Sequence, residues 1–187
     1  MTKTELRIAY RLKRKKLTEE QLEDYSLQIA NQLLQLAIWD FSFYHIFLTI
    51  TELHEVNTDF ILSILSGKDK NIVLSKSDFK TGLLKNFLLT DNTTIKKNKY
   101  NIPEPVDGIP IPAENIEVVF IPLLAFDTIG NRVGYGKGFY DTFLASCKPE
   151  TLKIGLSFFE AESKITDVFE GDIALDYCVT PKQVYRF

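Results

Sequence analysis

Short apolar runs that alternate with helix-like stretches constrain the fold of this chain more than any other feature. After Asp40, four short runs rich in β-branched and aromatic residues are typical of buried strands: 44–50, 71–75, 118–122 and 153–158. Helix-like stretches lie between them at 58–65 and 138–146. This alternation predicts an α/β domain, a three-layer sandwich with a mostly parallel open sheet and helices on both faces.

Two further segments are less regular. Residues 79–89 fit either a helix or a β-hairpin. Residues 96–105 contain Pro103 and Pro105, which exclude a central strand and favour extended backbone, so we expect a loop rather than a domain linker. The chain has 187 residues and no internal repeat, and we expect residues 1–187 to form a single domain.

Two helices are predicted at the N-terminus, each beginning with the capping-box pattern Thr-x-x-Glu/Gln at Thr2 and Thr18. We expect them to span 3–16 and 19–37. Four cations at steps of four, four and three share one face of the first helix: Lys3, Arg7, Arg11 and Arg14.

The charge distribution favours a local anion site over a nucleic-acid surface. The net charge is −3 and the isoelectric point about 5.5, yet seven of the first sixteen residues are Lys or Arg and one is acidic. A nucleic-acid-binding domain usually has a far more basic isoelectric point. We therefore expect a small anionic ligand and no nucleic acid.

The sequence also gives no support for a membrane protein, a disulfide-rich protein or a zinc protein. No run approaches the roughly 20 apolar residues of a membrane-spanning helix. Cys147 and Cys178, with two histidines in the chain, fit neither a disulfide framework nor a zinc site. The first residues resemble neither a secretory signal nor a transit peptide. We expect a cytoplasmic protein with reduced thiols and no membrane partner.

The segment 121–141 carries the strongest functional signal. A buried strand leads into a turn at 127–131, a loop with Gly134, Gly136 and Gly138, and then a helix. Glycines let successive N–H groups converge on an anion, and a helix N-terminus adds its dipole. Arg132 and Lys137 are expected as exposed cations of this loop whose removal leaves folding intact. Neither the P-loop pattern nor GxGxxG fits, so a phosphate cradle and a merely tight strand-to-helix turn both stay open.

Five motifs in order resemble the 5-formyltetrahydrofolate cyclo-ligase family, also called methenyltetrahydrofolate synthetase. The most specific is the run 130–141, GNRVGYGKGFYD. The shorter ones are Lys3 with Arg7, EVNT at 55–58, NIPEP at 101–105, and GD at 171–172 with VTP at 179–181. Two positions depart from the family pattern: Tyr100, where Trp is frequent, and Ser75, where proline is usual.

The resemblance implies an enzyme that converts 5-formyltetrahydrofolate and ATP to 5,10-methenyltetrahydrofolate, ADP and phosphate, with magnesium (Mg²⁺), as a monomer or weak homodimer. It implies catalytic roles for Arg132 and Lys137, and Mg²⁺ ligation by Asp141 and Asp172. The implied ATP-binding residues are Lys3, Arg7, Arg132, Val133, Gly134, Tyr135, Gly136, Lys137, Gly138, Phe139 and Tyr140. The implied folate-binding residues are Leu48, Glu55, Tyr100, Tyr135, Gly136, Lys137, Gly138 and Phe139.

Each assignment has a plainer alternative. The Lys3 and Arg7 face can be a solvated helix face, Glu55 a surface residue, and Leu48 a core residue. Asp141 can be a first-turn helix residue and Asp172 an ordinary turn aspartate. Two other functions stay open: a non-catalytic binder of nucleic acid or an acidic partner, and a phosphosugar isomerase or transferase on a similar sheet.

Overall fold

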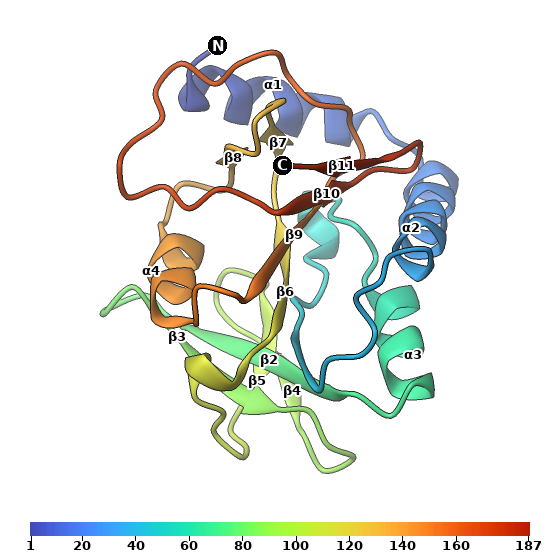
Figure 1. Cartoon of the computed structure of the whole chain (residues 1–187), viewed down its shortest axis with the longest axis vertical. Coiled ribbons are helices and arrows are strands. Elements are labelled where there is room, and N and C mark those ends of the chain that lie inside the picture. The colour runs from blue at the N-terminus through green and yellow to red at the C-terminus, as the bar shows by residue number, and fades with distance from the viewer.

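A seven-stranded sheet forms the centre of the protein, in a computed structural model that describes all 187 residues. Its strands are β1 Phe43–His45, β2 Asn71–Asp78, β3 Leu83–Leu88, β6 Val118–Pro122, β9 Leu152–Leu156, β10 Tyr177–Val179 and β11 Val184–Arg186. They lie in the order β11-β10-β9-β6-β1-β2-β3 (Figure 1). The five inner strands are parallel, and the edge strands β3 and β11 are antiparallel to their neighbours. The expected mostly parallel open sheet is confirmed.

Helices cover both faces of this sheet, as the alternation predicted. The α-helices are α1 Lys3–Lys15, α2 Glu19–Leu34, α3 Asp59–Gly67 and α4 Phe139–Ser146. In Figure 1, α2 and α3 lie on one side of the sheet and α4 on the other. Successive residues of β6 face opposite layers: Phe120 packs in the cluster with α2 and α3, and Val119 in the cluster with α4. None of these helices is long and apolar enough to cross a membrane.

Both N-terminal helices begin with the expected capping boxes. Thr2 caps α1 with Glu5, and Thr18 caps α2 with Gln21. The helices end earlier than predicted, at Lys15 and Leu34 rather than at 16 and 37. The apolar period misled the prediction because residues after Leu34 still pack into the core without being helical.

The predicted strand 44–50 is wrong in its second half. β1 ends at His45, and the Ile46 N–H makes one more bond to the Val73 carbonyl before the chain leaves the sheet. The ambiguous stretch 79–89 is part of the β2–β3 hairpin. The expected loop at 96–105 is partly wrong, because β4 Ile95–Lys97 pairs with β5 Pro103–Pro105 as a two-stranded ribbon. Prolines are tolerated there because the ribbon has no central strand.

A second small ribbon connects the sheet to the glycine loop. β7 Ala125–Phe126 pairs with β8 Arg132–Val133 around the turn at 127–131, where the buried Asp127 carboxylate accepts bonds from Ile129 and Asn131. Helix α1 packs on this ribbon through Leu6 and Tyr10, with Val133 in the same apolar cluster. The N-terminal helix is thereby held beside the glycine loop. Two short 3₁₀ helices, η1 Thr51–Leu53 and η2 Ala113–Asn115, complete the fold. Both cysteines are free thiols.

Candidate functional site

A cleft of about 770 Å³ opens at the carboxyl ends of β1, β2 and β6. This edge of a parallel sheet is where α/β proteins usually bind ligands. Of the residues proposed from the sequence, the cleft is lined by Lys3, Arg7, Leu48, Glu55, Tyr100, Arg132, Gly134, Tyr135, Gly136, Lys137, Gly138, Phe139, Tyr140, Asp141 and Asp172. Val133 is the exception, because its side chain is buried in the cluster under α1.

The glycine loop has the conformation that an anion cradle needs. Gly136 and Gly138 have φ of 88° and 72°, in the left-handed region that glycine tolerates best. A Cβ on Gly136 would also lie 3.2 Å from the Arg7 guanidinium, so the loop and α1 approach closely here. The backbone N–H groups of residues 134–138 donate to no protein acceptor. They are free for a ligand beside the N-terminus of α4.

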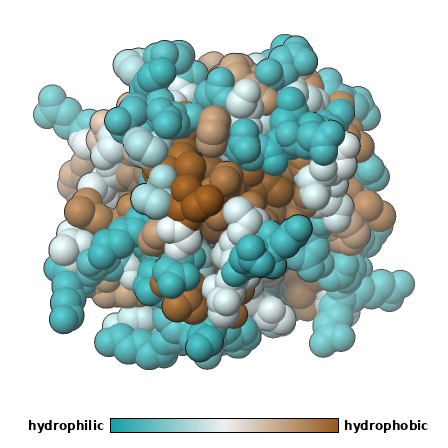
Figure 2. Space-filling view, turned by 90° about the horizontal axis from the view of Figure 1, so that it is seen from below, coloured by the Kyte–Doolittle hydropathy of each residue, from teal (hydrophilic) through white to brown (hydrophobic).

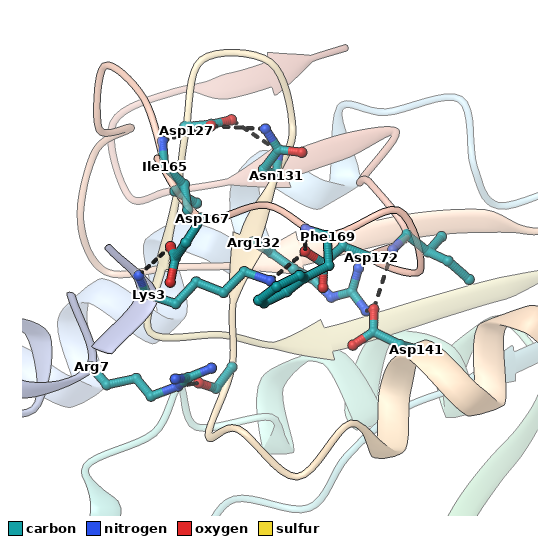
Figure 3. A network of polar contacts seen from close by, with 12 residues as sticks. Lys3, Arg7, Asp127, Asn131, Arg132, Asp141, Ile165, Asp167, Phe169 and Asp172 are labelled. Atoms are coloured by element: carbon teal, nitrogen blue, oxygen red, sulfur yellow. Dashed lines mark hydrogen bonds and ion pairs between the residues drawn. The ribbon is translucent and has the colours of Figure 1, made fainter. Parts of the chain in front are cut away.

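Two cations of helix α1 in the cleft, Lys3 and Arg7, are held by contacts with distant segments, contrary to the alternative of a solvated face. Lys3 is 7% exposed and forms an ion pair with Asp172, while its backbone N–H donates to Asp167 (Figure 3). Arg7 Nε donates to the Gly134 carbonyl at 3.0 Å. Both side chains are therefore placed by contacts with segments more than a hundred residues away.

Arg132 is not the exposed loop charge that the sequence suggested. It belongs to β8, its side chain is 7% exposed, and its Nη2 lies 2.7 Å from Asp141 Oδ1 (Figure 3). Burial lowers the pKa of the guanidinium, and Asp141 opposes that change. Its Nη1 is buried without a partner, which leaves a donor for a ligand. Lys137, in contrast, is exposed as expected and forms no ion pair in the structure.

The two aspartates proposed for Mg²⁺ each contact a cation of the cleft. Asp141 accepts from Arg132 and from the Ile173 N–H through Oδ1, and Asp172 accepts from Lys3 and the Phe169 N–H through Oδ2. Burial opposes ionisation of Asp172, but these bonds lower its pKa overall. No group of three or more His, Cys, Asp or Glu side chains is arranged so that it could hold a metal ion by itself. Asp141 Oδ2 and Asp172 Oδ1 accept no hydrogen bond from the protein.

Glu55 is buried rather than at the surface. It is 4% exposed; Oε1 accepts from the Tyr135 hydroxyl at 2.6 Å and Oε2 from the Ile50 N–H at 2.8 Å. The Tyr135 hydroxyl in turn accepts from Arg14 Nη1 at 2.8 Å. Burial raises the pKa of Glu55, against the opposing effects of Tyr135, Arg14 and Ile50. This chain of bonds connects α1, the glycine loop and the segment after β1.

Three aromatic rings from separate segments meet at the cleft. Phe79, after β2, lies 4.4 Å from Tyr100 and 5.2 Å from Phe139 between ring centroids. Tyr100 and Phe139 were implied by the resemblance, but Phe79 was not singled out. Only the β2–β3 hairpin brings Phe79 there, and no sequence pattern pointed to that contact.

Phe169, Asp167 and Arg11 also line the cleft without having been predicted. Figure 2 shows the face of the molecule that lies at the bottom of Figure 1, where a central apolar band is surrounded by hydrophilic side chains.

The fold and the cleft together define a class: a small α/β protein with a cleft at the carboxyl ends of its parallel strands, lined by cations and a glycine loop. Comparison with known sequences makes this specific. The chain belongs to the 5-formyltetrahydrofolate cyclo-ligase family, whose family model matches residues 1–178. The resemblance stated from the motifs is therefore confirmed.

Known relatives and structures agree with this membership. The mouse 5-formyltetrahydrofolate cyclo-ligase is 31% identical over 144 residues, 70% of this chain and 69% of that protein. A probable 5-formyltetrahydrofolate cyclo-ligase from Schizosaccharomyces pombe is 25% identical and is matched over 98% of its length. The structure of Aquifex aeolicus 5,10-methenyltetrahydrofolate synthetase covers 100% of this chain and is covered over 93% of its own, with a TM-score of 0.84 and 28% identity. A Mycoplasma pneumoniae synthetase has the same fold, with a TM-score of 0.77 at 20% identity.

Proposed function

We propose that the protein converts 5-formyltetrahydrofolate and ATP to 5,10-methenyltetrahydrofolate, ADP and phosphate. Family membership supports the reaction. The observation that carries it in the structure is the glycine loop, with its free N–H groups between the cations of α1 and β8. An ATP phosphate chain is the kind of ligand that such a loop binds.

The chemistry explains why these groups suffice. The formamide oxygen is a poor leaving group, so ATP transfers its γ-phosphoryl group to that oxygen. N10 of the same folate then attacks the formyl carbon, the carbon–oxygen bond breaks, N10 loses its proton, and phosphate leaves. Phosphoryl transfer depends on positioning and charge neutralisation more than on a protein nucleophile. Lys137 and Arg132 are the cations we assign to the transferring phosphoryl group, and Lys3 and Arg7 to the rest of the phosphate chain.

The remaining ATP contacts are proposed for the loop itself. Residues 133–140 would surround the phosphates, with Val133 contributing only backbone because its side chain is buried.

The two aspartates fit Mg²⁺ held jointly with ATP. Mg²⁺ usually takes one or two carboxylates and completes its shell with phosphate oxygens and water. Asp141 and Asp172 each keep one carboxylate oxygen without a protein donor, although their other oxygens bind cations. When bound, the ion would neutralise charge on the ATP phosphates. Asp141 and Asp172 would hold it, and Lys3 and Arg132 would orient them.

We place the folate beside Glu55, the aromatic rings and Leu48. The aminopyrimidine edge of a pterin presents hydrogen-bond donors, which a carboxylate accepts in pairs. Glu55 has two protein donors, and a carboxylate has about four acceptor sites, so two stay available. Tyr100, Phe139 and Leu48 supply apolar surface for the flat rings.

The direct test is the reaction itself. Purified protein with 5-formyltetrahydrofolate and Mg-ATP should produce the near-ultraviolet absorbance of the methenyl product, and neither ligand alone should do so. Absence of product, or product without ATP, would refute the proposal. We also propose a cytoplasmic monomer or weak homodimer, which fractionation and sedimentation can check.

A matched binding test separates the two subsites. Glu55→Gln keeps the side-chain size but presents an amide donor to the donors of the pterin, a loss of about 1.5–3 kcal/mol. Folate affinity should fall roughly 10- to 150-fold while ATP affinity stays unchanged. Calorimetric titration with each ligand decides this, because equal weakening of both ligands, or of neither, would remove Glu55 from the folate site.

A further inference from the structure

We propose that Arg14, to which the proposed reaction assigns no role, is a positioning residue for the folate: it acts through the Tyr135 hydroxyl to hold the Glu55 carboxylate in place. The proposal rests on the folate role of Glu55 proposed above. Arg14 lies in the last turn of α1 and is 2% exposed. A buried guanidinium without carboxylate contact is unusual and needs a structural reason.

The contacts of Arg14 are divided between two segments. Nη2 donates to the carbonyl of Leu123, the residue after β6, and Nη1 donates to the Tyr135 hydroxyl of the glycine loop at 2.8 Å. Its Nε is buried without a partner. The planar guanidinium therefore fixes the position of the Tyr135 oxygen relative to the sheet.

The polarity of the bonds follows from chemistry alone. Arg14 can only donate, so the Tyr135 oxygen must accept from it and uses its own proton for Glu55. That O–H···O⁻ bond is 2.6 Å, in the range of charge-assisted hydrogen bonds. Burial raises the pKa of Tyr135, as does the nearby Glu55, so the hydroxyl keeps its proton. The chain Arg14–Tyr135–Glu55 has one stable direction, which leaves Glu55 as the acceptor at its end.

Arg14 also supplies charge to a site that is otherwise unfavourable for an anion. The groups that face Glu55 are Tyr135 from the loop, Tyr140 from α4, the Ile50 N–H from the segment after β1, and Arg14 from α1. Arg14 is the only full positive charge among them. Burial raises the pKa of Glu55, and the Arg14 charge opposes that rise.

Removal of Arg14 should therefore change the pH dependence of folate binding. Without the cation, Glu55 binds a proton more readily, and a neutral acid accepts donors from the pterin less well. Loss of an adjacent opposite charge raises a carboxyl pKa by about one to three units. Folate binding should weaken near neutral pH and recover as the pH rises, because the carboxylate forms again.

The test compares Arg14→Gln, Arg14→Lys and the control Lys15→Gln, an exposed cation of the same helix without ion pair or hydrogen bond from its side chain. We expect Arg14→Gln to raise the KM for 5-formyltetrahydrofolate about tenfold near neutral pH and to move its acid limb up by about one unit, with the KM for ATP unchanged. Arg14→Lys should restore part of the loss, and Lys15→Gln should match the wild type. An unmoved acid limb would overturn the proposal. So would equal increases in both KM values, because a loosened α1 also displaces Lys3 and Arg7.

A double-variant cycle separates this inference from the folate role of Glu55. If Arg14 acts through Glu55, Arg14→Gln adds no further loss of folate affinity to Glu55→Gln, whereas additive losses overturn the proposal. If Glu55→Gln weakens folate and Arg14→Gln does not, only the Arg14 inference falls. If Glu55→Gln has no effect, the folate role of Glu55 falls and takes this inference with it. Thermal melts verify folding, and Arg14→Lys retains the test if the Gln variant does not fold.

Discussion

Replacement of His45 should change how the stability of the protein depends on pH. His45 is 0% exposed beneath Tyr140 and Phe143, and burial lowers its pKa from 6.5 to about 3. The Ser75 hydroxyl donates its proton to Asn86. We infer that the Ser75 oxygen accepts a hydrogen bond from the Nε2–H of His45, 2.7 Å away. The other ring nitrogen, Nδ1, is then a buried acceptor without a donor. The folded protein therefore holds a neutral ring.

The size of the effect follows from this pKa difference. As the pH falls below 6.5, the unfolded chain binds a proton at His45 that the folded chain does not. The free energy of unfolding then falls by up to about 1.4 kcal/mol per pH unit, until the folded ring titrates near pH 3. Across the whole window this amounts to about 5 kcal/mol, a large part of the usual stability of a domain.

Urea unfolding between pH 5 and 7.5 measures the slope directly. His45→Phe keeps a ring and removes the proton site, so its slope below pH 6 should be smaller than that of the wild type by about 1.4 kcal/mol per unit. Loss of the Ser75 bond lowers its stability equally at every pH and leaves the slope unaffected. The opposite contribution of Glu55, whose pKa is raised, is present in both proteins and cancels. His54→Asn is the control, because it removes the other histidine of the chain and should leave the slope that His45 causes in place. Asn tolerates the left-handed backbone at that position. Equal slopes in wild type and His45→Phe would refute the reasoning.

Three other predictions follow from the site and the core. Lys137→Ala should slow turnover roughly 100-fold or more and change the free energy of unfolding by no more than about 0.5 kcal/mol. Arg132→Ala should also slow turnover, but it should lower the free energy of unfolding by about 1–3 kcal/mol because it leaves Asp141 without its ion-pair partner. Steady-state rates and thermal melts together distinguish the two variants. Asp172→Asn should raise the Mg²⁺ concentration needed both for tight nucleotide binding in calorimetry and for half-maximal rate; unchanged Mg²⁺ curves would exclude it as a ligand. Gly155→Ala should lower the free energy of unfolding by about 1–3 kcal/mol in urea titrations, because the added Cβ would lie 2.5 Å from a methyl carbon of the buried Leu123. Wild-type stability of this variant would contradict the prediction, because it would mean that the core rearranges around the methyl group without loss of stability.

The layers of the fold were predictable because the period of the apolar residues reports what each element buries. The capping boxes at Thr2 and Thr18 placed both N-terminal helix starts correctly. Element ends were less predictable. Three of the residues 47–50 are apolar and line the cleft: Phe47, Leu48 and Ile50. From sequence alone, such a run cannot be distinguished from a strand buried in a sheet.

The cleft residues were predicted in part, for an equally physical reason. The glycine loop is local, so its spacing is visible in the sequence. The burial of Arg132 and Glu55 and the arrival of Phe79 depend on contacts between distant segments, and composition does not report these. Arg14 was visible only as one cation among four on a helix face, although its environment differs completely from that of Arg11.

The packing of α1 against the glycine loop and the segment before β10 has a consequence for how the protein is made. The bonds that complete the cleft join residues 121 to 169 positions apart: Arg14 to Tyr135, Arg7 to Gly134, Lys3 to Asp167 and Asp172. On the ribosome, α1 is synthesised before all of these partners and cannot complete the contacts until the segment that contains Asp172 has emerged. Contacts of such long separation form late in folding. Strands β1, β2, β3 and β6 are neighbours in the sheet and all precede residue 123, so this part of the sheet can form before α1 makes these contacts and before the protein can bind its ligands.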